Sequence, residues 1–228
     1  MKIKTYLNTT EQEIITRKFN ILIGISLGNK YFSREHIRDY LLWAITNTNE
    51  SIVVLIPDKI HALNYEIRCG YKKMRANTVA IRDGNKMENI VQNILNEFTP
   101  EQRALVLILK WHAIETNKHQ EMVRILYNEF EKNVQFKNEI IKIVKESINL
   151  DKVADLELEK LAAYPLEELP MLISGIEFNN IKYELLPYPG ISSIDNLVVG
   201  LQDGSIFPEI SKKLNILNKL RLIEAYDM

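Results

Sequence analysis

The first strong structural signal in the chain is the stretch ILIGISLGNKYFS at residues 21–33. Residues 19–27 form an apolar, partly β-branched run, which predicts a strand that is buried on both faces. Ser33 is a residue type that caps helices, and it predicts that a helix begins there. Gly24 and Gly28 suit the tight turn between these two elements. This order of strand, turn and helix is typical of the repeating unit of a parallel α/β sheet.

Strand and helix patterns alternate through the rest of the chain. Further strands are predicted at residues 51–57, 103–111, 181–186 and 196–201. Further helices are predicted at residues 62–68, 86–98, 117–130, 134–148 and 210–220, with a helical stretch from 156 to 176. The 8 Gly and 7 Pro suggest no long linker. We therefore expect a single α/β domain over residues 1–228, with a mainly parallel sheet flanked by helices.

The composition is that of an ordinary globular protein, with 46% hydrophobic residues, 26% charged residues and a net charge of −1. Binding to nucleic acid would therefore need a local basic patch. The one cysteine, Cys69, fits a reducing compartment and lacks the partners of a zinc site. The absence of a leader-like segment, of an apolar run of about eighteen residues and of heptads predicts a cytoplasmic monomer that binds no membrane.

The sequence GISLG at residues 24–28 matches the G-x-S-x-G elbow that presents the nucleophile of α/β-hydrolases. That fold needs a histidine after the serine, and the chain has His36, His61, His112 and His119. Such an elbow normally follows several strands, whereas Ser26 ends the first clear strand. The motif alone leaves open a serine hydrolase, another acyl transfer at Ser26, or a turn without catalytic function.

Three short motifs together resemble the signatures of one family, the tRNA-dependent cyclodipeptide synthases. The stretch GISLGNKYFS at residues 24–33 is similar to the N-terminal signature of that family. YPLEELP at residues 164–170 resembles its pattern of Tyr, three residues, Glu, one residue and Pro, and LPYP at residues 186–189 resembles its third catalytic block. The motifs follow the family's order and extend over nearly the whole chain.

The resemblance implies a Rossmann-like fold, similar to the catalytic domain of certain aminoacyl-tRNA synthetases, that uses no ATP. It also implies an enzyme that joins two amino acids, taken from two aminoacyl-tRNAs, into a cyclic dipeptide (a diketopiperazine). The reaction would pass through a Ser-linked aminoacyl-enzyme in a ping-pong mechanism. The sequence contains no G-x-x-x-x-G-K-[ST] or G-x-G-x-x-G motif and no histidine with ligand-spaced partners, so it indicates no cofactor and no metal.

By this resemblance, Ser26 is the nucleophile, and Tyr188 helps to position the substrate. Tyr164 and Glu168 would hold the α-ammonium group of the bound aminoacyl group. An aminoacyl ester is already activated, so a Ser can attack it without the strong base that an amide requires. Positions i and i+4 share one helix face, which lets Tyr164 and Glu168 converge on one amino group. Because Pro165 is tolerated best in a first helical turn, we expect Tyr164 at or just before a helix start.

Residues beside the motifs are candidates for the substrate pocket. An apolar amino-acid side chain needs apolar walls, and three apolar candidates lie next to the motifs: Leu22, Met171 and Leu186. Gly24 leaves room for the substrate. Asn29 belongs to the N-terminal signature. One subgroup of the family combines an Asn at this position with Tyr-His in the third block, and the other combines a variable residue with Tyr-Pro. This chain combines Asn29 with Tyr-Pro at residues 188–189.

A basic run at residues 68–86 is the best candidate for a tRNA-binding surface. Its basic residues are opposed only by Asp83, and they are Arg68, Lys72, Lys73, Arg75, Arg82 and Lys86. On one helix, Arg68, Lys72 and Arg75 would share a face and could contact backbone phosphates without reading sequence. The alternative is an ordinary solvated helix face.

Two other classes of function remain open from the residues alone. One is a serine hydrolase that uses Ser26, and the other is a non-catalytic RNA-binding α/β domain in which only the basic run matters. Residue types name neither the two amino acids nor the general base. A methylene group changes binding by only about 1–3 kcal/mol, so amino-acid choice depends on the shape of the pocket.

Overall fold

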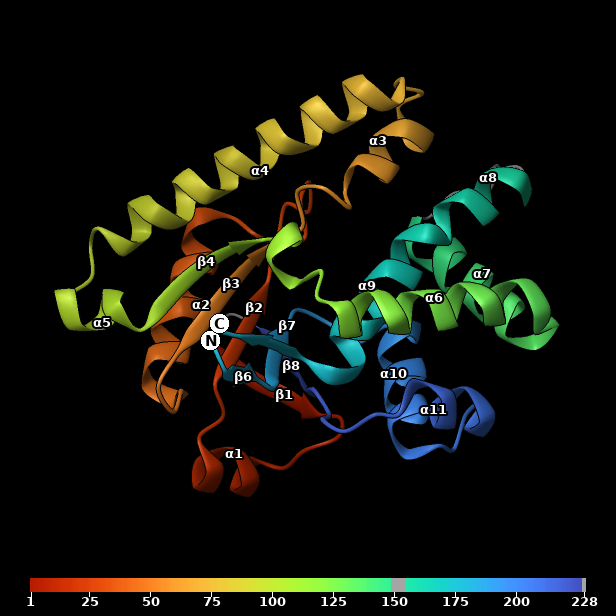
Figure 1. The fold of residues 1–228 in the computed structure, drawn as a ribbon. Coiled ribbons are helices and arrows are strands. Elements are labelled where there is room, and N and C mark those ends of the chain that lie inside the picture. The colour runs from red at the N-terminus through yellow and green to blue at the C-terminus, as the bar shows by residue number, and fades with distance from the viewer. Residues whose placement is uncertain (149–154, 227–228) are drawn as a thin grey trace.

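The computed structural model describes residues 1–148 and 155–226, and its centre is a mainly parallel sheet (Figure 1). Within these residues the sheet has six strands in the order β1-β8-β7-β2-β3-β4. They are β1 (Lys2–Tyr6), β2 (Ile21–Gly24), β3 (Ile52–Ile56), β4 (Val106–Lys110), β7 (Leu185–Tyr188) and β8 (Arg221–Tyr226). β1 pairs antiparallel with β8, and the other neighbouring pairs are parallel. A separate antiparallel hairpin consists of β5 (Ile176–Phe178) and β6 (Ile181–Tyr183).

The direction of winding reverses in the middle of the sheet. From β2 the chain moves outward through β3 to β4, then returns to β7 on the other side of β2 and continues outward to β8. This is the doubly wound order of Rossmann-like folds, and β2 and β7 flank its topological switch point. Ligands of such folds bind outside the carboxyl ends of the strands at that point, so the ends of β2 and β7 locate a site.

Helices cover both faces of the sheet (Figure 1). They are α1 (Glu11–Arg17), α2 (Arg34–Asn47), α3 (Ala62–Arg68), α4 (Lys73–Leu95), α5 (Pro100–Ala104), the 3-10 helix η1 (Trp111–Ile114), α6 (Asn117–Lys132), α7 (Val134–Ile148), α8 (Asp155–Leu161), α9 (Ala163–Ser174), α10 (Ser193–Asp203) and α11 (Pro208–Leu214). Ile21 and Ile23 of β2 pack in one core with α2 and α4, whereas Leu22 packs in the opposite core with α6, α7, α9 and α10. Alternate residues of β2 thus pack in two cores on opposite faces of the sheet. The predicted α/β class is confirmed.

The opening stretch folds as predicted. The Ser33 side chain accepts a hydrogen bond from the backbone N–H of His36 at 3.3 Å and caps α2. Gly28, in the turn between β2 and α2, has a φ of 79°, which favours glycine. Other predictions are confirmed with small shifts at their ends: the strands at 51–57 and 103–111 and the helices at 62–68, 117–130 and 134–148.

The predicted strand at residues 196–201 is wrong, because this segment lies inside α10. Leu197 and Leu201 are four residues apart and both are buried, which is the spacing of one helix face. Ser192 and Asp195 form a capping box that starts the helix. A run of consecutive apolar residues does not distinguish a buried strand from a buried helix, so the cap was the informative signal.

Two predicted helices have different bounds. The helix predicted at 86–98 begins at Lys73, because α4 also includes the polar residues of the basic run. The stretch predicted from 156 to 176 is divided into α8 and α9. α9 ends before Gly175, whose φ is 70° and where an added Cβ would lie 2.2 Å from the Tyr183 carbonyl oxygen.

Elements near the end of the chain also differ from the predictions. The strand at 181–186 is divided between β6 and β7, and the last helix ends at Leu214, not at 220. The sequence did not predict β1, α1 or β8, whose polar residues obscure the pattern. In the part of the chain that the structure describes, no helix has the length and hydrophobicity to cross a bilayer.

Candidate active site

A cavity of about 810 Å³ opens at the carboxyl ends of β2 and β7, at the switch point of the sheet. Its walls come from the turn after β2, from α3, α7 and α9, from the end of β7 and from the first turn of α10. Segments far apart in the sequence therefore share one cavity. All three motifs contribute residues to it.

Ser26 lies in the turn after β2, is partly exposed and lines the cavity. The backbone of this turn is held by hydrogen bonds: the N–H of Ile25 donates to the Leu55 carbonyl at 3.0 Å, and the N–H of Asn29 donates to the Ser26 carbonyl at 3.2 Å. Gly24 also lines the cavity, and a Cβ there would lie 3.6 Å from Leu186 Cδ1. The turn thus presents a fixed hydroxyl group with little side-chain bulk beside it.

Tyr188 is the last residue of β7, next to β2 in the sheet, and it lines the same cavity. Burial raises the pKa of its phenol, and the nearby charge of Glu168 adds to this rise. Hydrogen bonds with Ser26 and Asn29 act in the opposite direction. The phenol is therefore neutral at physiological pH, and it lies within hydrogen-bonding reach of the Ser26 hydroxyl.

Tyr164 and Glu168 come from α9, which forms another wall of the cavity. Tyr164 is the second residue of α9 and Pro165 the third, so the expected position of Tyr164 at a helix start is confirmed. Burial raises the pKa of Glu168 to about 7, and the charge of Asp195 adds to the effect. Burial also raises the pKa of Tyr164 well above its ordinary value, with smaller contributions from Glu168 and Tyr188. The neighbours of Glu168 thus supply no charge that favours its ionised form.

The other pocket candidates divide into two groups. Met171, Leu186 and Asn29 line the cavity, as expected for them. Leu22 does not line it, because this residue is fully buried in the core below the cavity floor. Leu22 lies two residues before Gly24 on the same face of β2, and only the residues of this segment from Gly24 onward reach the cavity.

The basic residues belong to two helices instead of one. Arg68 is the last residue of α3, and the chain then turns at Gly70, with a φ of 63°, before α4 begins at Lys73. Arg68, Lys72 and Arg75 therefore do not share the face of a single helix, which corrects the sequence-based expectation. Arg68 lines the cavity, whereas the remaining candidates are exposed at or on α4: Lys72, Lys73, Arg75 and Arg82.

Local contacts hold part of this basic surface. The Arg75 guanidinium lies 4.1 Å from the centroid of the Tyr71 ring, a cation–π contact. Arg82 and Lys86 both contact Asp83, at 3.1 and 3.3 Å. Asp83 thus balances part of the positive charge at that end of the run, while Lys72 and Lys73 face solvent beside the start of α4.

Two further residues line the cavity that were not among the site residues expected from the resemblance. His61 packs edge-on against Tyr164 with ring centroids 6.3 Å apart, and burial lowers its pKa to about 4, with a further contribution from Arg68. Asp195 lines the cavity from α10. The Ser-x-x-Asp pattern at residues 192–195 could have revealed a helix start, but nothing local shows that this helix start faces Ser26.

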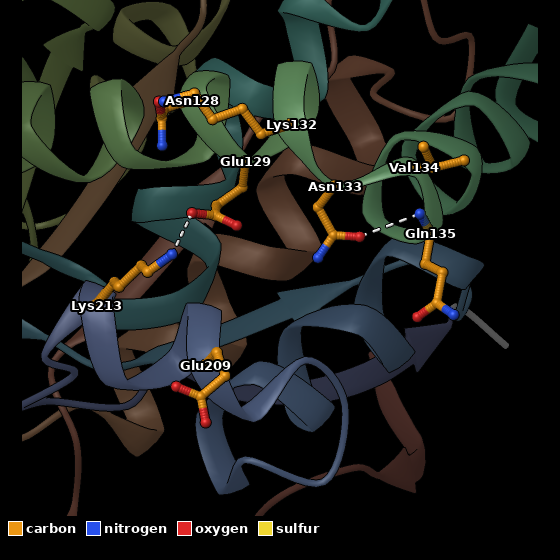
Figure 2. Close-up of a pocket in the computed structure, with 8 residues that line it drawn as sticks. All are labelled: Asn128, Glu129, Lys132, Asn133, Val134, Gln135, Glu209 and Lys213. Atoms are coloured by element: carbon orange, nitrogen blue, oxygen red, sulfur yellow. Dashed lines mark hydrogen bonds and ion pairs between the residues drawn. The ribbon is translucent and has the colours of Figure 1, made fainter.

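A second pocket, of about 590 Å³, lies between α6, α7 and α11 and contains none of the motif residues (Figure 2). Its buried carboxylate, Glu129, contacts the Lys213 ammonium at 2.7 Å. Asn133 caps α7 there by accepting a hydrogen bond from the N–H of Gln135 at 3.1 Å. These groups are partnered within the protein, so we assign the candidate active site to the cavity at the switch point. Among the described residues, no cluster of His, Cys, Asp or Glu is arranged to hold a metal ion.

Comparisons with known proteins identify the family of the chain. The profile of a family described as "Cyclodipeptide synthase" matches residues 4–205. Among curated proteins, cyclo(L-tyrosyl-L-tyrosyl) synthase of Mycobacterium tuberculosis is 29% identical over 89 residues. This match covers 39% of the chain and spans 30% of the length of that relative.

Two solved structures share the fold. A Mycobacterium tuberculosis protein, whose structure relates cyclodipeptide synthetases to type I tRNA synthetases, has a TM-score of 0.67 and 21% identity, over 80% of this chain and 78% of that one. A cyclodipeptide synthase from Candidatus Glomeribacter gigasporarum, bound to Phe-tRNAPhe, has a TM-score of 0.63 and 18% identity, over 96% and 91% of the two chains. The expected likeness to a tRNA synthetase fold is thereby confirmed. Since the family profile covers most of its length, this chain belongs to the cyclodipeptide synthase family.

Proposed function

We propose that the protein joins the aminoacyl groups of two aminoacyl-tRNAs into a cyclic dipeptide, through an aminoacyl-enzyme linked to Ser26. The observation that carries this proposal is that residues from all three motifs line one cavity at the switch point: Ser26, Tyr164, Glu168 and Tyr188. Membership of the cyclodipeptide synthase family supports it. The relative from Candidatus Glomeribacter gigasporarum binds an aminoacyl-tRNA, which supports the same class of substrate.

In the first step, the Ser26 oxygen attacks the ester carbonyl carbon of an aminoacyl-tRNA. The ester bond to the tRNA breaks, and its 3′-terminal ribose leaves as a free hydroxyl after taking up a proton, so the aminoacyl group is now esterified to Ser26. The neutral phenol of Tyr188 can donate a hydrogen bond to the oxygen on which negative charge develops, because hydrogen bonding links it to Ser26 in the free protein.

Glu168 and Tyr164 hold the α-ammonium group of that aminoacyl group. The free carboxyl of Glu168 has a pKa of about 7, and an arriving ammonium group lowers it, because an opposite charge favours the ionised form. Binding of the substrate thus promotes ionisation of the Glu168 carboxyl group, and the resulting carboxylate binds the ammonium group. Two amide bonds then form by attack of an α-amine on an ester, and the second closes the ring and releases Ser26. Two aminoacyl-tRNAs give one cyclic dipeptide and two free tRNAs.

The exposed basic residues at the start of α4 bind the tRNA backbone. Lys72, Lys73 and Arg75 are exposed on the side of the molecule that continues from Arg68 at the cavity. Replacing these three residues by Ala together should weaken tRNA binding and reduce the slope of log affinity against log salt, since each neutralised phosphate releases counterions. A filter-binding titration at several salt concentrations measures both. An unchanged slope would argue against this surface.

The serine hydrolase alternative is disfavoured by the histidine that the cavity offers. His61 lines the cavity with Ser26, but its pKa of about 4 makes it a weak base at neutral pH. Attack on an activated ester makes a smaller demand on the base than amide hydrolysis does. A fluorophosphonate probe that labels Ser26, with ester turnover and no cyclic dipeptide, would favour the hydrolase instead. Binding of tRNA without any acyl-enzyme would favour a non-catalytic RNA-binding domain.

The proposal is tested by expressing the protein in a bacterial host and measuring diketopiperazines in the medium by mass spectrometry. Ser26→Ala should abolish the product while the protein stays folded. Ser211→Ala is a matched control, because Ser211 lies on α11, outside the cavity, and only bonds the Phe207 carbonyl in its own helix. Normal product from Ser26→Ala would refute the nucleophile, and the identity of the product names the two amino acids.

A further inference from the structure

The cavity contains more acidic groups than the three motifs account for. Among the described residues that line it, the acids are Glu146 from α7, Glu168 from α9 and Asp195 from α10. Arg68 is the one Lys or Arg in the same set, and it is exposed. A cavity with this balance of charge favours cationic groups inside it, because Arg68, its one Lys or Arg among the described residues, is open to solvent.

Asp195 is positioned by its own helix start. The backbone N–H and the hydroxyl of Ser192 both donate to one oxygen of Asp195, Oδ2, at 2.7 and 2.9 Å. The other carboxylate oxygen, Oδ1, can therefore accept a donor from a bound molecule. The Asp195 side chain is half-buried in the cavity wall, and burial raises the pKa of its carboxyl above the ordinary value.

Asp195 is also electrostatically coupled to the motif residues. Its charge raises the pKa of Glu168 and contributes to the rise for Tyr188, so all three side chains share one desolvated space. Two carboxylates that line one cavity and have no cation paired with them in the described part of the chain are an unfavourable arrangement in the empty protein. Such an arrangement becomes favourable when cationic groups bind, because each ammonium group can neutralise one carboxylate.

The proposed reaction brings two α-ammonium groups into this cavity, one for each aminoacyl substrate. We propose that Asp195 accepts the α-ammonium group of the second aminoacyl substrate, in the same cavity as Glu168, which holds the first. This inference rests on the proposed function. It makes Asp195 a substrate-binding residue of the second half of the reaction and predicts that the first half proceeds without it.

The groups that face these two carboxylates come from several elements. They are Tyr164 on α9, Tyr188 on β7, Glu146 on α7, Arg68 on α3 and His61 just before α3. The pKa values of both tyrosines are raised and that of His61 is lowered to about 4, so these three groups stay neutral near pH 7. A change in the pH dependence near neutrality, on removal of Asp195, therefore reports on Glu168.

The test separates the two halves of the reaction in Asp195→Asn. Asn keeps an oxygen that can accept the hydrogen bonds of Ser192 but carries no charge. The enzyme is first mixed with a substoichiometric amount of tRNA charged with an amino acid found in the product of the expression experiment, and the acyl-enzyme is measured by intact mass. Excess charged tRNA is then added, and the cyclic dipeptide is measured over time.

We expect acyl-enzyme formation at the wild-type rate and a loss of about 10- to 100-fold in the second half, the size of one charge-assisted hydrogen bond. Asp203→Asn is the matched control, because Asp203 is the last residue of the same helix, is exposed, and accepts a local hydrogen bond from the Ser205 N–H at 2.8 Å. That control should leave both halves unchanged. Asp195→Glu keeps the charge and should retain more of the second half than Asp195→Asn.

A second measurement excludes a merely structural role. In Asp195→Asn the pKa of Glu168 falls, so the acid limb of the pH profile for product formation should move to lower pH. A wild-type second half with an unmoved acid limb would overturn the role of Asp195 and leave the proposed function intact. Absence of any acyl-enzyme on Ser26 in the wild-type protein would overturn the proposed function, and the inference with it.

Discussion

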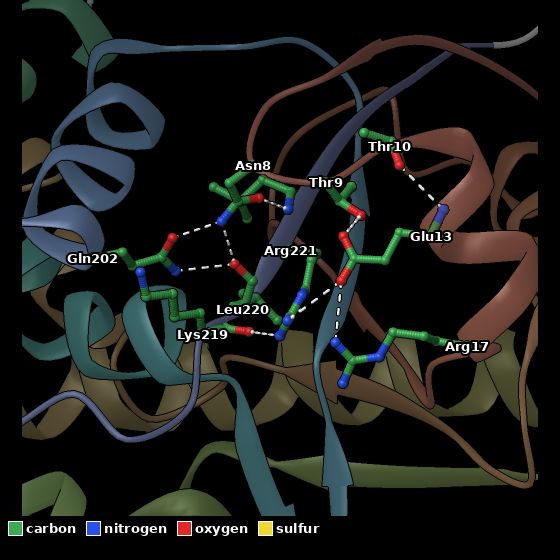
Figure 3. A network of polar contacts seen from close by, with 10 residues as sticks. Asn8, Thr9, Thr10, Glu13, Arg17, Gln202, Lys219, Leu220 and Arg221 are labelled. Carbon is green, nitrogen blue, oxygen red and sulfur yellow. Dashed lines mark hydrogen bonds and ion pairs between the residues drawn. The ribbon is translucent and has the colours of Figure 1, made fainter.

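The two ends of the parallel sheet hold polar clusters whose charges are partnered in opposite ways. At the amino end, near the starts of β2 and β8, Glu13 contacts Arg17 at 3.1 Å and Arg221 at 3.5 Å (Figure 3). At the carboxyl end, Glu168 and Asp195 line the cavity, and burial raises the pKa of each. The Glu13 carboxylate of the first cluster contacts two arginines, whereas in the second cluster the charge of Asp195 adds to the raised pKa of Glu168.

The amide groups at the amino end are also fully engaged. The Gln202 amide donates to the Leu220 carbonyl at 2.9 Å and accepts from Asn8 at 2.6 Å (Figure 3). It also donates to the Ile173 carbonyl at 2.8 Å. Buried polar groups stabilise a fold when they are paired, so this network connects the N-terminal segment, α10 and β8. The cavity instead leaves acidic groups for a bound molecule. The polar groups that stabilise the fold are therefore those with partners inside the protein, and the groups available to a substrate are those that line the cavity.

The largest effect is expected from Glu168→Gln, which should reduce product formation about 100-fold or more, because the α-ammonium group loses its charged partner. The same change should stabilise the protein at pH 8, by about 2 kcal/mol or roughly 4–8 °C in Tm, since a desolvated charge is removed. Glu167→Gln, at the neighbouring position outside the cavity, is the matched control and should keep its product. Product assays and thermal melts measure both, and full activity of Glu168→Gln would contradict the role.

The pH dependence of the wild-type protein sharpens the same contrast. Glu168 binds its proton more tightly in the folded than in the unfolded state, so its ionisation destabilises the fold as pH rises from about 4.5 through about 7. Activity needs the ionised form, so kcat/KM should fall about tenfold per pH unit below pH 7. Stability and activity should thus change in opposite directions between pH 5 and 8. A kcat/KM that stays constant over this range would show that Glu168 does not limit the reaction.

At the amino end, Gln202→Ala should reduce stability without affecting chemistry. The change removes three hydrogen bonds of a buried amide, two donated to the Ile173 and Leu220 carbonyls and one accepted from Asn8, at about 1 kcal/mol each. Stability should therefore fall by about 2–3 kcal/mol, or roughly 5–10 °C in Tm. Activity per folded molecule should be unchanged, because Gln202 lies outside the cavity. Gln92→Ala on the exposed surface of α4 is the control and should leave Tm nearly unchanged. Loss of activity at full folding would break the proposed division between the two ends.

The smallest effect is expected for Arg17→Ala in the same network. The Arg17 side chain is 52% exposed, and Glu13 keeps its contact with Arg221, so stability should change by less than about 0.5 kcal/mol. A denaturant titration compared with wild type measures the difference. A loss as large as that of Gln202→Ala would mean that the ion pairs, and not the buried amide, carry the stability of this end.

Sequence patterns placed Ser26, Tyr164 and Glu168, the proposed nucleophile and ammonium acceptors, because their structural signals are local. The strand, turn and helix around Ser26 follow from an apolar run, a glycine turn and a capping serine within thirteen residues, 21–33. The spacing of Tyr164 and Glu168 places both on one helix face. Asp195 was missed because residues 196–201 have consecutive apolar positions, which suit a strand or a helix equally well.

Two other residues lie in different places from those expected. Leu22 was expected in the pocket but lies in the core, and Arg68 was expected on an outer helix face but lines the cavity. The first depends on where a strand ends relative to the cavity floor, and the second on the turn at Gly70 between α3 and α4. Both are set by contacts between elements that are distant in the sequence.

The α/β class, most of the helices and strands and the chemistry of the motif side chains follow from patterns of short range, since periodicity, caps and turn residues act within a few positions. The environment of those side chains is not local. The raised pKa of Glu168, the weak basicity of His61 and the presence of Asp195 in the same cavity arise only when α3, α9 and α10 pack around the switch point. Desolvation depends on which surfaces exclude water together, and that depends on packing between segments more than a hundred residues apart, such as Ser26 and Tyr188.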